Sequence, residues 1–301
     1  MRPMTMRFPA GLSVGFKTSP QAATWAQLDE TWAAAGELEV FTAGWLNDHL
    51  TDMTEAGGPS FEALTLLATL VHRVPGKWVG HGVLSNTFRH PAVVAKAATV
   101  LDHATGGRFV LGLGAGWHEL EHRAFGIPLP PIRERIDRLE SAVEVITALF
   151  SPDAAAPPGV TRPDPFYPLD GATNDPPPLT PGGPPIFLGG QRRRGIALAG
   201  RAADGWLLPG VNAGDERYFA AKRDELLVAL ERAGRSAEGF AWVGQVHVGA
   251  SAQDRTRALD ESRALRAVGA THIVLGMPPS RGPDGLRVIA REVAEPLMDE
   301  S

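Results

Sequence analysis

Short apolar runs alternate along the chain with longer segments in which apolar side chains recur every three or four positions. The short runs are typical of buried β-strands, and the periodic segments are typical of helices with one apolar face. Strands that alternate with such helices favour a parallel sheet covered by helices. We expect eight strands, at residues 12–16, 38–41, 78–84, 109–113, 186–188, 206–208, 242–248 and 273–275.

Capping residues indicate where the helices begin. Ser19 and Pro20 predict the start of the first helix, and Ser60 predicts a cap for the second. Pro91 is expected to open a third helix, because proline is well accommodated at the first helical position. A further, long helix is expected to end near Phe150.

Eight strand–helix units in 301 residues predict a (β/α)₈ TIM-type barrel, in which residues 1–301 form a single domain. A doubly wound open sheet is the structural alternative. Residues 151–184, before the fifth strand, are rich in proline and are expected to form an extended insertion. This insertion either roofs the active site or forms a strap on the surface.

Composition narrows the classes of function. Hydrophobic residues make up 44% of the chain, the net charge is −5, and there is no cysteine. Disulfides and thiolate chemistry are therefore excluded, and a nucleic-acid partner is not expected. No apolar segment approaches the ~20 residues of a membrane span, so a cytoplasmic protein is expected.

The active site of a (β/α)₈ barrel lies just after the strands, so the residues there are the candidates. Gly189 and Gly190 precede Arg192 and Arg193, which suggests a phosphate site at a helix N-terminus. The alternative is a tight turn with solvated arginines. The glycines of residues 112–116 lack the final spaced glycine of a dinucleotide fingerprint.

Two histidine-containing segments also follow strands. His49, next to Asp48, is a candidate proton donor or acceptor, or else a structural histidine. His118 to His122 has the order H-E-x-x-H of zinc hydrolases, but it directly follows a glycine-rich strand end. A solvated helix face is the favoured reading, and no metal site is predicted.

Several motifs resemble the luciferase-like flavin-dependent oxidoreductases, most closely the coenzyme F420-dependent branch. The resemblance spans roughly residues 10–280 and is most specific at 111–126. It rests on residues 85–91, 106–126, 133–139, 185–190 and 203–206. It implies a (β/α)₈ barrel that holds F420, or alternatively FMN, across the strand ends.

The resemblance also implies roles for individual residues. A non-prolyl cis peptide is expected near Gly82-Val83, behind the ring, and His49 is expected beside the reactive ring carbon. The residues implied to contact the ring are Ser85 and Asp48, and those implied to hold the phosphate region are Ala115, Gly116, Gly189, Gly190, Arg192 and Arg193.

These expectations combine into a two-electron oxidoreductase that moves a hydride between F420 and an organic substrate. Trp45 and Trp117 are expected to shape an apolar substrate pocket. Trp117 stands where sugar-phosphate dehydrogenases of the family carry an acid, so that substrate is not predicted.

The alternatives are an FMN-dependent monooxygenase supplied by a partner reductase, a non-catalytic cofactor-binding protein and a zinc hydrolase. A flavin or F420 reductase is a possible partner, and the resemblance implies a homodimer.

Overall fold

A computed structural model describes residues 8, 9, 11–52 and 58–300, and it contains a closed barrel of parallel strands. β3 pairs with β5, and β1 pairs with β11, so that eight strands close into a ring. The predicted barrel is confirmed, and the doubly wound alternative is wrong. The ring is formed by β1 (Ser13–Thr18), β2 (Phe41–Leu46), β3 (Trp78–His81), β5 (Phe109–Gly114), β8 (Ile186–Leu188), β9 (Gly205–Leu207), β10 (Ala241–His247) and β11 (His272–Gly276), with the short β4 (Leu84–Ser85) paired to β5.

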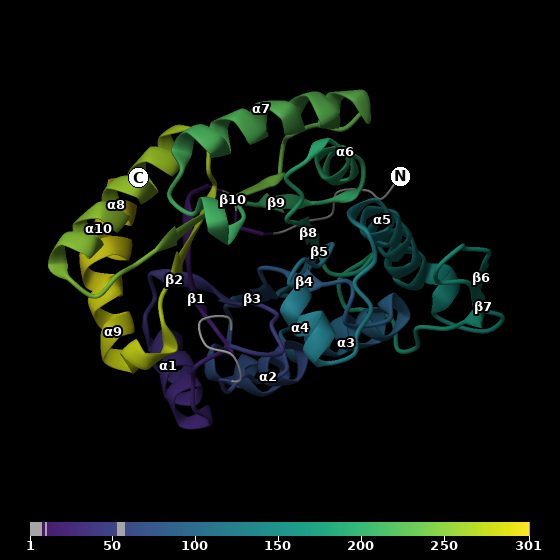
Figure 1. Cartoon of the computed structure of the whole chain (residues 1–301), viewed down its shortest axis with the longest axis horizontal. Helices are drawn as coiled ribbons and strands as arrows, with labels where there is room; N and C mark the ends of the chain where they lie inside the picture. The colour runs from purple at the N-terminus through teal and green to yellow at the C-terminus, as the bar shows by residue number, and fades with distance from the viewer. Residues whose placement is uncertain (1–7, 10, 53–57, 301) are drawn as a thin grey trace.

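Helices surround the strands on the outside, as Figure 1 shows. They are α1 (Trp25–Glu37), α2 (Ala63–Leu70), α3 (Pro91–Ala104), α4 (Glu119–Ala124), α5 (Ile132–Leu149), α6 (Arg193–Ala202), α7 (Glu216–Arg232), α8 (Ala252–Ala267), α9 (Gly282–Ile289) and α10 (Glu295–Asp299), with a π-helical turn at Ala290–Ala294. Short 3₁₀ turns lie at Val71–Arg73, Pro152–Ala154, Gly210–Asn212 and Pro279–Arg281. No helix in the described part of the chain is long and apolar enough to cross a membrane.

Two predicted helix starts are wrong, although Pro91 opens α3 as expected. The cap of α1 is Thr24, whose side chain and Gln27 form a reciprocal capping box, so the helix begins after Ser19 and Pro20. The cap of α2 is Glu62, and the Ser60 hydroxyl instead donates to the His49 carbonyl at 2.9 Å.

The second strand is also displaced from its predicted position. Residues 38–41 form a turn, in which the Phe41 N–H donates to the Leu38 carbonyl at 3.2 Å. The apolar run continues through Trp45 and Leu46, and β2 occupies that later part. As a result, Asn47 directly follows the strand end.

The core has two parts. A smaller cluster fills the barrel interior and includes Trp45, Val110, Phe187 and Val243. A larger cluster lies between the strands and the surrounding helices. Inward and outward side chains alternate along each strand, which is why adjacent strand residues join different clusters.

The proline-rich insertion is a strap on the outside of the barrel, so its alternative role as a roof over the strand ends is wrong. Its hairpin, β6 (Val160–Arg162) and β7 (Leu169–Ala172), lies beside α5 in Figure 1. Lys96 of α3 donates to the Asp175 carbonyl at 3.0 Å, and the Thr180 N–H donates to Asp102 of α3 at 2.7 Å. These contacts hold the insertion against α3.

Candidate functional site

Most of the predicted site residues gather at one end of the barrel, because the ends of parallel strands share one edge. Asp48 and His49 follow β2, and Gly82 and Val83 separate β3 from β4. The remaining predicted residues Ser85, Ala115, Gly116, Gly189 and Gly190 end or follow β4, β5 and β8.

The peptide bond between Gly82 and Val83 is cis, as expected. The Val83 side chain lies among glycines of two neighbouring strands. A Cβ atom at Gly114 would lie 2.7 Å from Val83 Cγ2, and one at Gly189 would lie 3.5 Å from Val83 Cγ1. Glycine at position 114 is therefore required for this close approach, and positions 82, 83 and 189 form one continuous surface.

Ser85 and Gly116 meet next to this surface. A Cβ atom at Gly116 would lie 2.8 Å from Ser85 Oγ and 2.4 Å from Thr87 Oγ1, and Gly116 has φ +78°. Both constraints require glycine. Arg135 of α5 donates to the Gly116 carbonyl, while its buried Nε has no partner among the described residues. Burial lowers the pKa of Arg135.

Asp48 is buried and holds the β4 segment through a network. Its oxygens accept from Arg89 at 2.7 and 2.8 Å, and Oδ2 also accepts the Ser85 N–H at 2.8 Å. Arg89 bonds Glu62 as well. Burial raises the pKa of Glu62, but hydrogen bonds from Thr65 and the charge of Arg89 outweigh burial and lower this pKa to about 2. Asp48 thus positions Ser85, since both its oxygens are bonded to protein donors.

His49 is held by Glu121 of α4, which is 1% exposed. The distance from His49 Nδ1 to Glu121 Oε2 is 3.2 Å, and Glu121 also accepts the N–H groups of Leu50 and Thr51. Burial raises the pKa of Glu121, but the His49 and backbone bonds outweigh it and lower the pKa. This carboxylate therefore orients the imidazole.

The two histidines of the H-E-x-x-H segment have different partners. His122 Nδ1 donates to the His118 carbonyl at 2.7 Å, so Nε2 accepts from Thr87 Oγ1 at 2.6 Å in the neutral ring. His118 Nδ1 lies 3.6 Å from Glu121. Among the described residues, no group of three or more His, Cys, Asp or Glu side chains is placed to hold a metal ion.

The turn after β8 leads directly into α6. A Cβ atom at Gly190 would lie 2.8 Å from Gly195 Cα, so glycine allows this turn to pack against the helix. Arg192 is the N-cap residue of α6, and its exposed side chain has no bonded partner in the described chain. The first N–H groups of α6 and this guanidinium are available to an anion.

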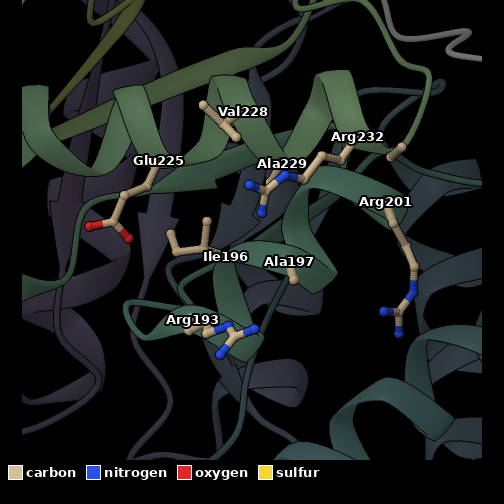
Figure 2. Close-up of a pocket in the computed structure, with 9 residues that line it drawn as sticks. Arg193, Ile196, Ala197, Arg201, Glu225, Val228, Ala229 and Arg232 are labelled. Atoms are coloured by element: carbon tan, nitrogen blue, oxygen red, sulfur yellow. The ribbon is translucent and has the colours of Figure 1, made fainter.

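The other arginines of the triplet have different surroundings. Figure 2 shows Arg193 in a groove between α6 and α7, on the outer side of the barrel, where Ile196 and Val228 also line it. Arg194 pairs with Asp137 of α5 at 2.6 Å. The structure therefore does not bring Arg193 together with the glycine turn as predicted, because its side chain lines the groove between α6 and α7.

The two tryptophans predicted to line a substrate pocket are separated. Trp45 is fully buried in the barrel interior, where its indole donates to His272 Nε2 at 3.0 Å and stacks on Phe187. Its predicted pocket role is wrong, because position 45 of β2 points inward. Trp117 is 59% exposed, and its ring lies edge-on to the His49 ring, with 6.1 Å between the ring centroids.

Sequence reasoning missed two residues at this end of the barrel. Glu121 lies inside the H-E-x-x-H segment, where it was considered only as part of a metal motif. Lys17 is the one charged residue of β1, and a lone cation in a buried strand was the available signal. Its ammonium donates to the Gly82 carbonyl at 3.0 Å and to Gln245 Oε1 at 2.9 Å.

Comparison with known proteins gives consistent results. The model of the luciferase-like monooxygenase family matches residues 10–291. An F420-dependent glucose-6-phosphate dehydrogenase from Nakamurella multipartita is 30% identical over 261 residues, which cover 86% of this chain and 74% of that protein. A 5,10-methylenetetrahydromethanopterin reductase from Archaeoglobus fulgidus is 27% identical over 251 residues, which cover 83% of this chain and 67% of that protein.

A solved structure has the same fold. It is an F420-dependent secondary alcohol dehydrogenase in complex with an F420–acetone adduct, with a TM-score of 0.80 at 16% identity, covering 94% of this chain and 98% of that one.

Proposed function

Because the chain belongs to the luciferase-like monooxygenase family, we propose that it is an enzyme that transfers a hydride between coenzyme F420 and an organic substrate. The F420-dependent relative that matches 86% of the chain supports this choice of cofactor. The structural observation that carries the proposal is the Val83 side chain, which lies against Gly114 of β5 and against Gly189 directly after β8.

The residues at the strand ends fit a flat ring with an anionic tail. Gly82, Val83 and Ser85 would lie against the ring, and the free N–H groups of α6 with Arg192 would hold the tail phosphate. Ala115 and Gly116 would line the path between them. When bound, F420 supplies a ring carbon that accepts or donates the hydride.

His49 is the group we assign to the proton that accompanies the hydride. When a hydride leaves a substrate carbon, the attached hydroxyl must lose a proton, and a neutral imidazole accepts it. Glu121 then stabilises the imidazolium at 3.2 Å. Trp117, exposed and edge-on to His49, would form one wall of the substrate site.

Titration of the purified protein with F420 and with FMN tests the proposal. We expect F420 to quench tryptophan fluorescence at micromolar concentration, and FMN to bind much more weakly. Tight binding of FMN without F420 would instead support the monooxygenase. His49→Ala should retain F420 affinity and lose turnover, and an unchanged turnover would reject the assigned proton transfer.

We further propose that the enzyme is a homodimer and that, when it reduces its substrate, a separate reductase supplies the reduced cofactor. Val93 and Val100 are both 62% exposed and lie on one face of α3, which supports a contact there. Light scattering on the eluted protein tests the dimer, and a monomeric mass would reject it. Turnover with chemically reduced F420 would show that the reductase is dispensable.

A further inference from the structure

Lys17 lies at the end of β1 and reaches across the barrel end to the cis peptide. An ammonium has three protons, and two of them bond the Gly82 carbonyl and Gln245 Oε1. The Gln245 amide is itself fixed, because its Nε2 donates to the Leu208 carbonyl. No described protein group accepts the third proton, so Lys17 retains one donor.

The charge of Lys17 has no counter-charge in the described chain. None of the ion pairs between described residues includes Lys17, and burial lowers its pKa to about 8. The titratable group that faces it is His247 of β10, whose own pKa is lowered first by burial and in part by the charge of Lys17. A neighbouring histidine adds positive charge on protonation, so it cannot compensate a lysine.

Lys17 is half-buried in β1, and a partly desolvated cation without a counter-charge is unfavourable in the folded protein. An apolar side chain at this position would avoid that cost. The uncompensated charge is therefore best explained by an anionic ligand. Lys17 Nζ lies 3.9 Å from the position that a Cβ atom at Gly82 would occupy, on the surface assigned to the ring.

We propose that Lys17 is the counter-ion of the bound cofactor ring, a role that rests on the proposed F420 site. The ring is negative when its phenolic hydroxyl is ionised, and it gains further negative charge when a hydride arrives. If bound F420 took the hydride while His49 took the proton, the ring would gain negative charge, and Lys17 would stabilise that charge. Lys17 contributes by electrostatics and exchanges no proton.

Three substitutions separate charge from hydrogen bonding. Lys17→Met removes both, Lys17→Gln keeps a donor without charge, and Lys17→Arg keeps the charge. Lys96→Met is the matched control, because it removes the same net charge from α3 on the outer face. The readouts are F420 affinity by fluorescence quenching, the pKa of the bound ring by absorbance titration, and the urea midpoint of the protein without cofactor.

We expect Lys17→Met and Lys17→Gln to bind F420 about tenfold more weakly and to raise the pKa of the bound ring by about one unit. Their urea midpoints should equal or exceed that of the wild type. Lys17→Arg should keep the ring pKa close to the wild-type value, and Lys96→Met should change none of these properties.

A purely structural Lys17 predicts the opposite pattern. If Lys17→Met lowers the urea midpoint and leaves the ring pKa unchanged, or if Lys17→Gln retains wild-type affinity and ring pKa, the counter-ion role is refuted. If the wild-type protein itself does not bind F420, the proposed function fails rather than this inference alone.

Discussion

Replacement of Asp48 by asparagine tests how the site is held in place. Asp48 accepts from two nitrogens of Arg89 and from the Ser85 N–H, and its carboxylate is inaccessible to solvent. In Asp48→Asn, one oxygen becomes an NH₂ group that faces those donors. The Arg89 guanidinium, only 14% exposed, also loses its buried counter-charge.

The expected loss of unfolding free energy is large. Breaking a buried ion pair by removing one partner costs about 3–5 kcal/mol, because the other charge remains buried. Glu62 provides the matched control, since it bonds the same guanidinium but its side chain is 39% exposed. Glu62→Gln keeps an oxygen that can cap α2, so it should cost only about 0–1 kcal/mol, as is usual for solvent-accessible pairs.

Urea denaturation of the three proteins at pH 7 measures this difference. We also expect weaker F420 binding in Asp48→Asn, because the Ser85 N–H loses the acceptor that positions β4. Glu62→Gln should bind F420 normally. Equal destabilisation by the two substitutions would show that burial of the Asp48 pair does not determine its contribution, and the reasoning would be refuted.

Three further outcomes are expected. Burial lowers the pKa of His272 to about 3, so the folded state binds this proton more weakly than the unfolded chain. The stability contributed by neutral His272 is complete above about pH 6.5 and is lost as the pH falls toward 3. Urea denaturation at pH 7 and at pH 4.5 should therefore show that the free energy of unfolding falls by about 3 kcal/mol less in His272→Gln than in the wild type. Gly114→Ala should weaken F420 binding at least tenfold in a fluorescence titration, because the new Cβ would lie 2.7 Å from Val83 Cγ2; wild-type affinity would show that the surface at Val83 is not part of the site. Dialysis against a chelator should leave turnover unchanged, because His122 bonds Thr87 and the His118 carbonyl while Glu121 bonds His49 and two backbone N–H groups; a loss restored by zinc would contradict that assignment.

Local features of the molecule could be read from the sequence, because they depend on neighbouring residues. Apolar runs and helical periodicity predicted the strands and the barrel, and Pro91 marked the start of α3. The resemblance located the cis peptide at Gly82-Val83. The cap of α1 was misassigned, because Ser19 and Thr24 have the same local capability, and only the partner Gln27 distinguishes them.

By itself, then, the sequence determined the order of the elements and the segments that meet at the strand ends. Only the tertiary structure decided which side chains meet there. Glu121 lies 72 residues from His49, and no periodicity predicts that contact. Trp45 turned inward because its position on β2 faces the barrel axis, and Lys17 became a candidate because closure of the ring placed its ammonium against Gly82. Such contacts depend on how strands far apart in the sequence are packed, and local patterns do not contain that information.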